Sequence, residues 1–212
     1  MLDPFYFIFV LAGISLLPVL AILTTSFSKI VIVLSILRQA LGTPQAPPNM
    51  VIVSLALILT CFSMYPVWQN IADNLNINSL STQKPKEALE IFVDAAKEPI
   101  KNFLYSQSQK EDKQLFLDLL KKKQANTYTK EILESDLIIV APAFLISQLA
   151  LAFKIGFLIY LPFVVIDMTI ANLLMALGMQ MLSPTTISIP FKLMLFVLMD
   201  GWRLLAQNLV KI

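Results

Sequence analysis

Five charged side chains interrupt an apolar C-terminal stretch, and side chains of these types can act in catalysis or ion transfer. They are Lys154, Asp167, Lys192, Asp200 and Arg203. Intramembrane hydrolysis would need two Asp, or a Ser with a His, and the chain contains no His. Asp167 and Asp200 are the only acidic residues of this stretch, and we do not expect them to form a catalytic pair.

A charge at the centre of a bilayer costs about 2.5–3.5 kcal/mol on insertion scales, so these five side chains should pair or face water. Asp200 and Arg203 are three residues apart and can meet on one helix face. We expect Asp167 to meet Lys192 or Lys154 across helices. Because acids and bases are matched, fixed ion pairs between helices or subunits are favoured over a proton or ion path.

Other kinds of site have little support in the sequence. The five glycines form no phosphate-binding loop, and no Cys or His cluster could hold a metal. Cys61 is the single cysteine, and its apolar surroundings predict a buried hydrophobe rather than a reactive thiol. The net charge of +2 does not suggest a nucleic-acid surface. We therefore predict no enzyme activity, cofactor, metal or nucleic-acid partner.

Methionines are concentrated near the C-terminus, where six of the nine fall in the last 45 residues. Ordinary apolar packing is the simpler interpretation, but methionine is also soft and fills changing gaps. In the segment from Gly178 to Pro184, the glycine permits a bend and the proline is expected to stop the helix, with Met179 and Met181 at the break. A broken helix at membrane depth needs surrounding protein or a cavity, which hints at an oligomeric pore.

The composition indicates which elements position these residues. Hydrophobic residues make up 57% of the 212 residues and charged residues 14%, against about 25% charged in ordinary soluble domains. The mean hydropathy is +0.74. Of the 30 charged residues, 21 lie in residues 73–136. We predict an all-α protein with an apolar helical hairpin at 1–72, a polar helical insertion at 73–136, and a second apolar hairpin at 137–212.

Four uncharged or nearly uncharged segments are long enough to cross a bilayer, which needs about 20 residues. They are Pro4–Ser28, Met50–Trp68, Leu137–Phe153 with its continuation Ile155–Ile166, and Met168–Phe191. A last apolar helix is expected at about Pro190–Val210. The first segment has no basic residues before it and is interpreted as an uncleaved helix.

Basic residues in short loops predict the orientation. Lys29 and Arg38 flank the first turn, which places that turn in the cytoplasm and residues 73–136 outside, in the periplasm of a bacterial inner membrane. Within that polar segment, apolar residues at helical spacing predict amphipathic helices at 86–105, kinked at Pro99, and at 111–123. This segment is expected to pack on neighbouring proteins outside the membrane.

A run of motifs in order resembles the FliP/SctR family of type III export-gate proteins over nearly the whole chain. The motifs are Thr25-Ser-Phe-Ser-Lys-Ile30, Leu37-Arg-Gln-Ala-Leu-Gly42, Gln45-Ala-Pro-Pro-Asn49, Ala141-Pro-Ala-Phe144, Ala152-Phe-Lys-Ile-Gly-Phe-Leu-Ile-Tyr-Leu-Pro-Phe163, Val165-Ile-Asp167, Met175-Ala-Leu-Gly-Met179, Ser183-Pro184, Ile187-Ser188, Pro190-Phe-Lys-Leu193 and Leu198-Met-Asp-Gly-Trp202. Residues 73–136 match least.

The resemblance implies a pore-forming subunit of a helical export gate, through which unfolded proteins leave the cytoplasm. Its implied partners are further copies of itself, FliQ/SctS-like and FliR/SctT-like subunits and the larger export apparatus. Its helices are then buried largely against other subunits. The family's methionine constriction maps to Met179 and Met181, with Gln180 interrupting the usual run of methionines.

Two branches of the family leave different signals in this chain. The short N-terminus and Ser183-Pro184-Thr185-Thr186 resemble the virulence injectisome branch, whereas Gly42-Thr43-Pro44 followed by Ala46-Pro47-Pro48 resembles the flagellar branch. The injectisome is favoured. The alternatives to an export pore are a proton-coupled transporter subunit that uses Asp167 and Asp200, and a membrane scaffold without a pore.

Overall fold

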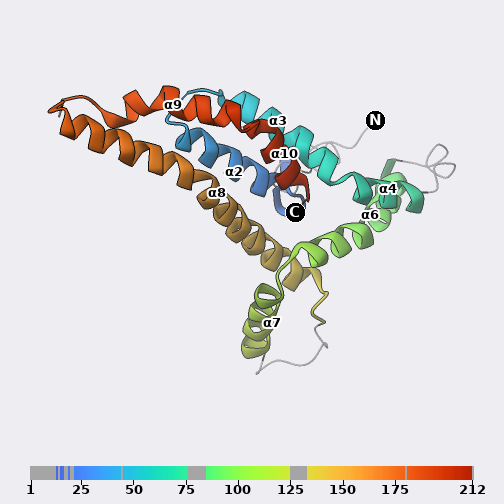
Figure 1. Cartoon of the computed structure of the whole chain (residues 1–212). Helices are drawn as coiled ribbons and strands as arrows, with labels where there is room; N and C mark the ends of the chain where they lie inside the picture. Colours follow the sequence, from blue (N-terminus) through green and yellow to red (C-terminus); the bar gives the residue numbers. More distant parts are fainter. Residues whose placement is uncertain are drawn as a thin grey trace. The chain divides into compact units, whose positions relative to one another are not determined.

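The computed structural model describes residues 13, 15, 16, 19, 22–43, 45–75, 85–124, 133–179 and 181–211. In these ranges the chain is helical and contains no strand, which confirms the all-α prediction. The helices, traced in order in Figure 1, are α2 (Phe27–Ala40), α3 (Asn49–Ser63), α4 (Tyr65–Asn74), α6 (Pro85–Gln107), α7 (Lys110–Gln124), α8 (Leu137–Ala176), α9 (Pro184–Leu198) and α10 (Gly201–Lys211).

The chain divides into two compact units. The first unit comprises Met1–Ser28 and Met64–Gln148, and the second comprises Lys29–Ser63 and Leu149–Ile212. The long helix α8 begins in the first unit and continues through the second. The predicted three-part division at residues 72 and 136 follows composition and stays a prediction.

In the first unit, α4 packs on α6. Met64, Val67 and Ile71 meet Ala96 in one apolar cluster, and a second cluster joins Leu104 of α6 to the start of α8. Both helices predicted for the polar segment are present as α6 and α7. Pro99 lies inside α6, and the helix continues through it.

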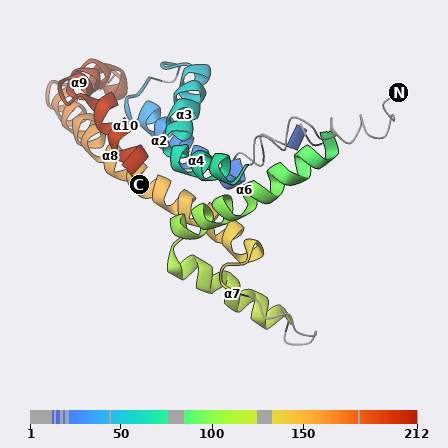
Figure 2. The same cartoon turned by 90° about the vertical axis from the view of Figure 1, so that its right-hand side faces the viewer.

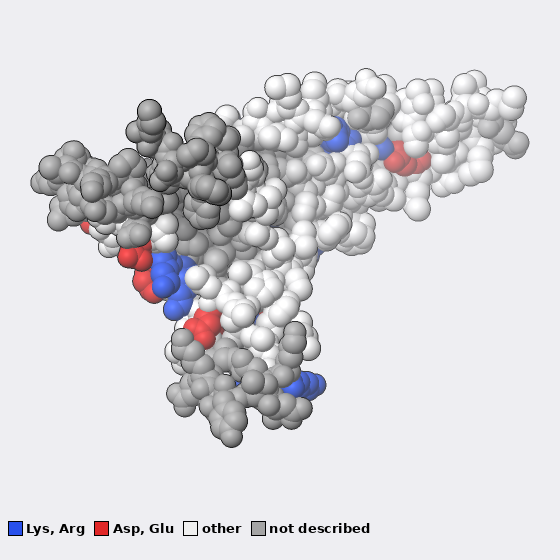
Figure 3. Space-filling model, turned by 180° about the vertical axis from the view of Figure 1, so that it is seen from behind, with Lys and Arg blue, Asp and Glu red and all other residues white. Residues whose placement is uncertain are grey.

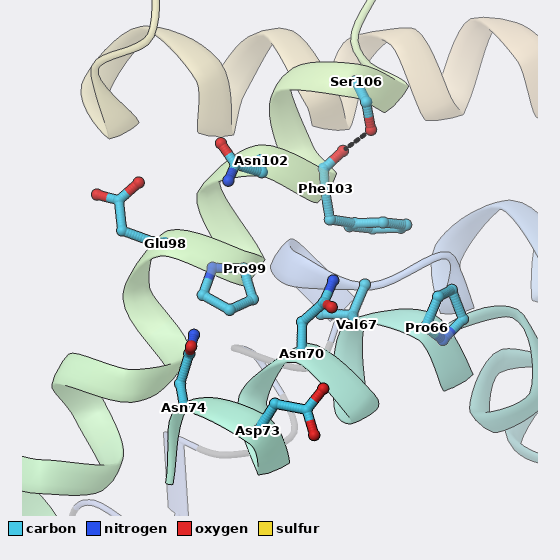
Figure 4. Close-up of a pocket in the computed structure, with 10 residues that line it drawn as sticks. All are labelled: Pro66, Val67, Asn70, Asp73, Asn74, Glu98, Pro99, Asn102, Phe103 and Ser106. Atoms are coloured by element: carbon cyan, nitrogen blue, oxygen red, sulfur yellow. Dashed lines mark hydrogen bonds between the residues drawn. The ribbon is translucent and has the colours of Figure 1, made fainter.

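A pocket of about 530 Å³ opens between α4 and α6 beside Pro99. Figure 4 shows polar side chains from both helices around it, including Asn70 and Asp73 of α4 and Asn102 of α6. Among the residues that the structure describes, no group of three or more His, Cys, Asp or Glu side chains could hold a metal ion.

Helix α7 is fixed by polar contacts at its start. The Ser147 hydroxyl on α8 donates to the Asp112 carboxylate and accepts the Gln109 backbone N–H at 2.9 Å. Lys113 is buried, donates to the Tyr105 carbonyl at 3.1 Å and lies 3.6 Å from the centre of the Tyr105 ring. The polar segment is therefore an ordered helical structure over its described residues.

In the second unit, α9 runs back alongside the C-terminal half of α8, as Figures 1 and 2 both show, and α10 packs against α3 and α9. Two glycines permit close packing. A Cβ on Gly156 of α8 would lie 2.3 Å from the Ile36 side chain of α2, and a Cβ on Gly201 would lie 2.2 Å from the Phe196 ring. Phe196 also meets Trp202 edge to face, with ring centres 5.3 Å apart.

The predicted spans need correction. Leu137–Phe153 and its continuation Ile155–Ile166 belong to one helix, but that helix does not end at Asp167, because α8 runs for 40 residues to Ala176. A single charged side chain can leave a helix sideways without breaking the backbone hydrogen bonds. Met168–Phe191 is not one helix, since α8 ends at Ala176 and α9 begins at Pro184. The expected helix at Pro190–Val210 is broken between α9 and α10.

Fewer helices pass as membrane spans than the four predicted. In the described part of the chain, α8 alone is long and apolar enough to cross a membrane, and α3 with α4 would make a second if the pair, broken at Met64, is counted as one span. Met50–Trp68 is thus interrupted rather than continuous. The predicted segment Pro4–Ser28 lies largely outside the described residues.

Candidate functional site

The connection between α8 and α9 is formed by a specific helix ending. The Met179 N–H donates to the Leu174 carbonyl at 2.9 Å, and the Gly178 N–H donates to the Met175 carbonyl at 3.1 Å. Gly178 has φ +72°. These two bonds and a left-handed glycine are the Schellman motif, which satisfies the last carbonyls of a helix.

Helix α9 begins at the other side of this connection. Ser183 is the N-cap residue with extended backbone, and Pro184 occupies the first helical turn, where its fixed φ and missing N–H do no harm. The expectation that Pro184 stops a helix is therefore wrong, because this proline lies at the start of α9 and not at the end of α8. The break itself falls in the predicted segment, between Gly178 and Pro184.

The predicted methionine constriction lies in this connection. Met181 is fully exposed at 100%, and Met179 is 48% exposed. Leu177 and Leu182 beside them are exposed as well, whereas Gln180 lies outside the described residues. Exposed apolar surface costs about 25 cal/mol per Å², so this tip is suited to contact other protein surfaces.

A buried ion pair joins α8 to α9 along the hairpin. The Lys192 ammonium lies 2.6 Å from Oδ2 of Asp167, and the two side chains are 3% and 25% exposed. The Ser188 hydroxyl donates to the other carboxylate oxygen. Both oxygens of Asp167 therefore have partners, as a carboxylate held away from water requires.

Gly42, in the connection between α2 and α3, lies over this ion pair. Its φ is +74°, and a Cβ there would be 3.4 Å from Ile189 and 3.8 Å from the Lys192 nitrogen. Ser188 and Gly42 were not predicted as site residues. Ser188 lies four residues before Lys192, so both fall on one helix face. This spacing could have indicated that Ser188 lies close to Lys192 and its partner.

Asp200 and Arg203 also pair, but in another setting than predicted. Their side chains are 3.3 Å apart and more than two thirds exposed. Asp200 precedes α10 with φ +51°, and its carbonyl accepts the N–H groups of Arg203 and Leu204. The pair therefore spans the start of a helix rather than one helix face, and an exposed pair contributes at most about 1 kcal/mol.

Lys154 is exposed on α8 and has no ion-pair partner among the described residues. The expectation that it could meet Asp167 across helices is wrong, because both lie on α8 several turns apart. The other predicted partner, Lys192, takes that place. In Figure 3 the arm formed by the α8–α9 hairpin is almost entirely white, with a small group of charged atoms.

Lys29 on α2 is a buried cation. In the sequence analysis it served only to predict the orientation in the membrane, and its burial was not predicted. Its side chain is 0% exposed, and its nitrogen has no hydrogen-bond partner within the described ranges. Burial lowers the pKa of the Lys29 ammonium from its ordinary 10.5.

We predict that Asp167→Asn lowers the free energy of unfolding by about 3–5 kcal/mol, because it leaves the Lys192 charge buried without its partner. The measurement is equilibrium unfolding in mixed detergent micelles. Asp200→Asn is the matched control and should cost less than about 1 kcal/mol. The double variant Asp167→Leu with Lys192→Met should recover most of the loss. Equal effects of the two Asp→Asn changes would contradict this account.

A second prediction concerns pH. Because folding lowers the Lys29 pKa, the unfolded chain holds more protons between that lowered value and 10.5, so stability rises with pH in this window. Lys29→Met removes the buried charge and should be more stable than the parent at neutral pH, with a difference that shrinks as pH approaches 10.5. Lys97→Met, at an exposed position of α6, is the control variant.

Comparison with known proteins places these features in a family. The model of the FliP family matches residues 10–209. The Yop proteins translocation protein R of Yersinia pestis is 45% identical over 98% of this chain and 95% of its own length. The flagellar biosynthetic protein FliP of Caulobacter vibrioides is 48% identical over 93% of this chain and 72% of its own length. The hypersensitivity response secretion protein HrcR of Ralstonia nicotianae is 42% identical over 93% of this chain and 92% of its own length. The chain therefore belongs to the FliP family of secretion-apparatus components and is not an enzyme.

Proposed function

We propose that this chain is a pore-forming subunit of a type III protein export gate that passes unfolded proteins across the bacterial inner membrane. The observation that carries the proposal is the α8–α9 connection, which presents Met179 and Met181 at an exposed tip. With Gln180 between them, these residues form the constriction of the closed pore. Methionine suits a seal that must yield to a passing chain, because its side chain is flexible and apolar.

Several copies of the chain, together with FliQ/SctS-like and FliR/SctT-like subunits and the rest of the export apparatus, make up the proposed gate. The exposed apolar surface supports such an assembly. Only 17% of the most apolar window of α8 is buried within the chain, so lipid or partner subunits must cover the rest. The gate lies in the inner membrane, and we place the polar segment on the periplasmic side. Lys29 and Arg38, from which that orientation was predicted, lie within α2 instead of flanking a turn, and Lys29 is buried there.

The charged residues support a structural role rather than proton transport. Asp167 is held by Lys192 and Ser188 on the same hairpin, and Lys192 is almost completely buried. A proton-coupled transporter would need Asp167 to change partners during each cycle, whereas both of its carboxylate oxygens are bound within this hairpin. Lys154 and the Asp200–Arg203 pair remain at exposed positions, where they can meet water, lipid head groups or other subunits.

Replacing both Met179 and Met181 with Ala should raise ion leakage through the assembled gate without preventing assembly, because the smaller side chains leave the constriction open. The gate is purified after co-expression with its neighbouring export-gate genes and reconstituted into vesicles, where conductance is measured. Met194→Ala is the control, since Met194 is also exposed but lies within α9. Unchanged leakage in an assembled double variant would contradict the constriction, and a gate without any channel would favour the scaffold.

We also propose the injectisome rather than the flagellum as the setting, supported by Ser183-Pro184-Thr185-Thr186 at the start of α9. Relatives from both systems are similar to this chain to nearly the same degree. The expected result is that the gene restores secretion to an injectisome mutant that lacks its own copy. Restored motility of the corresponding flagellar mutant, without restored secretion, would reverse the assignment.

A further inference from the structure

An apolar groove of about 480 Å³ lies within the second unit, between α8, α9 and α10. Ile155 and Ile159 line it from α8, Phe196 from α9, and Leu204 and Leu205 from α10. Its volume lies in the range of about 300–1,000 Å³ that is usual for small-molecule sites. Neither the ion pair nor the methionine tip uses this groove.

The floor of the groove is fixed by close packing. Gly201 allows the Phe196 ring to lie against the start of α10, and the Trp202 ring meets Phe196 edge to face. Asn208 is the one side chain with a polar end group among the residues that line the groove. An occupant must therefore be apolar over most of its length.

A cation, Lys154, lies on α8 next to the residues that line the groove, although it does not line the groove itself. Lys154 precedes Leu158, a lining residue, by one helical turn on the same face of α8. Lys154 is exposed and has no ion-pair partner among the described residues, and the next charge along α8 is Asp167, which Lys192 neutralises. The site thus combines a free positive charge with an adjoining apolar groove, which is the complement of an anionic amphiphile.

We propose that this groove binds one acyl chain of an anionic phospholipid whose phosphate lies at Lys154. The acyl chain follows α8 from Ile155 toward Phe163, between α9 and α10. The inference rests on the membrane placement in the proposed function but not on the pore. A lipid bound here would cover apolar surface that a single chain leaves open, and it would hold α10 against α8.

The test measures lipid preference through Trp202. In the Trp68→Phe variant, Trp202 is the only tryptophan left in the chain. The full chain is reconstituted into phosphatidylcholine vesicles that contain increasing fractions of lipid with brominated acyl chains, as either phosphatidylglycerol or phosphatidylcholine. Bromine quenches tryptophan at short range, so the two titrations give the relative affinity of the site for the two head groups.

We expect phosphatidylglycerol to be preferred about fivefold, the effect of one basic residue near a membrane surface. Lys154→Gln should remove the preference and Lys154→Arg should keep it. Arg203→Gln, at another exposed cation, should keep it as well. For the groove, Leu158→Phe should reduce the quenching at saturation, whereas Leu161→Phe, at an exposed position that does not line the groove, should not.

Equal affinity for the two lipids, or a preference that survives in Lys154→Gln, would overturn the lipid site. A photoreactive amino acid in place of Leu204 that cross-links to a second copy or to another gate subunit, rather than to lipid, would also overturn it. If neither brominated lipid quenches Trp202, the lipid site fails together with the membrane placement. Quenching without a head-group preference overturns the lipid site alone and leaves the pore proposal intact.

Discussion

The ion pair between Asp167 and Lys192 is the constraint on which the α8–α9 hairpin depends. A helix surface as apolar as α8 offers many nearly equivalent ways to pack against α9, because Leu, Ile, Val and Phe side chains interdigitate in more than one register. A charge that is 3% exposed allows only the register in which its partner meets it. Ser188 and the backbone at Gly42 complete the arrangement, so one polar contact fixes where α9 lies and where the connection to it must fall.

The second constraint is the amount of apolar surface that remains uncovered. Large hydrophobic side chains are exposed along α3, α8 and α9, although ion pairs and small residues order the helices internally. A soluble monomer rarely exposes so much contiguous apolar area. The chain therefore has the surface of a subunit that is covered by lipid or by other proteins. Burying this apolar surface releases free energy, which can drive assembly with lipid or with other subunits.

The sequence predicted the helical class, both helices of the polar segment, the Asp167–Lys192 contact as one of two choices, and the position of the break near Gly178. It failed where local rules were applied to charges and prolines one at a time. A new span was predicted to begin after Asp167, yet a helix tolerates a single charge and α8 continues to Ala176. Pro184 was taken as a stop, although proline is equally suited to a first turn. The burial of Lys29 could not be predicted, because burial depends on tertiary packing; the expected turn at Lys29 is part of helix α2.

The placement of rigid and soft elements along the hairpin bears on how a gate could open. Between Asp167 and the end of α8 at Ala176 there is no further charge, and the two and a half turns above the ion pair hold only apolar and small polar side chains. Parting α8 from α9 at the ion pair would expose an uncompensated Lys192 to an apolar surrounding, at a cost of several kcal/mol. Moving the tip costs much less, because the Schellman ending at Gly178 is held by two backbone bonds and the methionines adapt by changing rotamer. In the proposed gate, we therefore expect a passing polypeptide to displace the connection while the ion pair holds the rest of the hairpin in place.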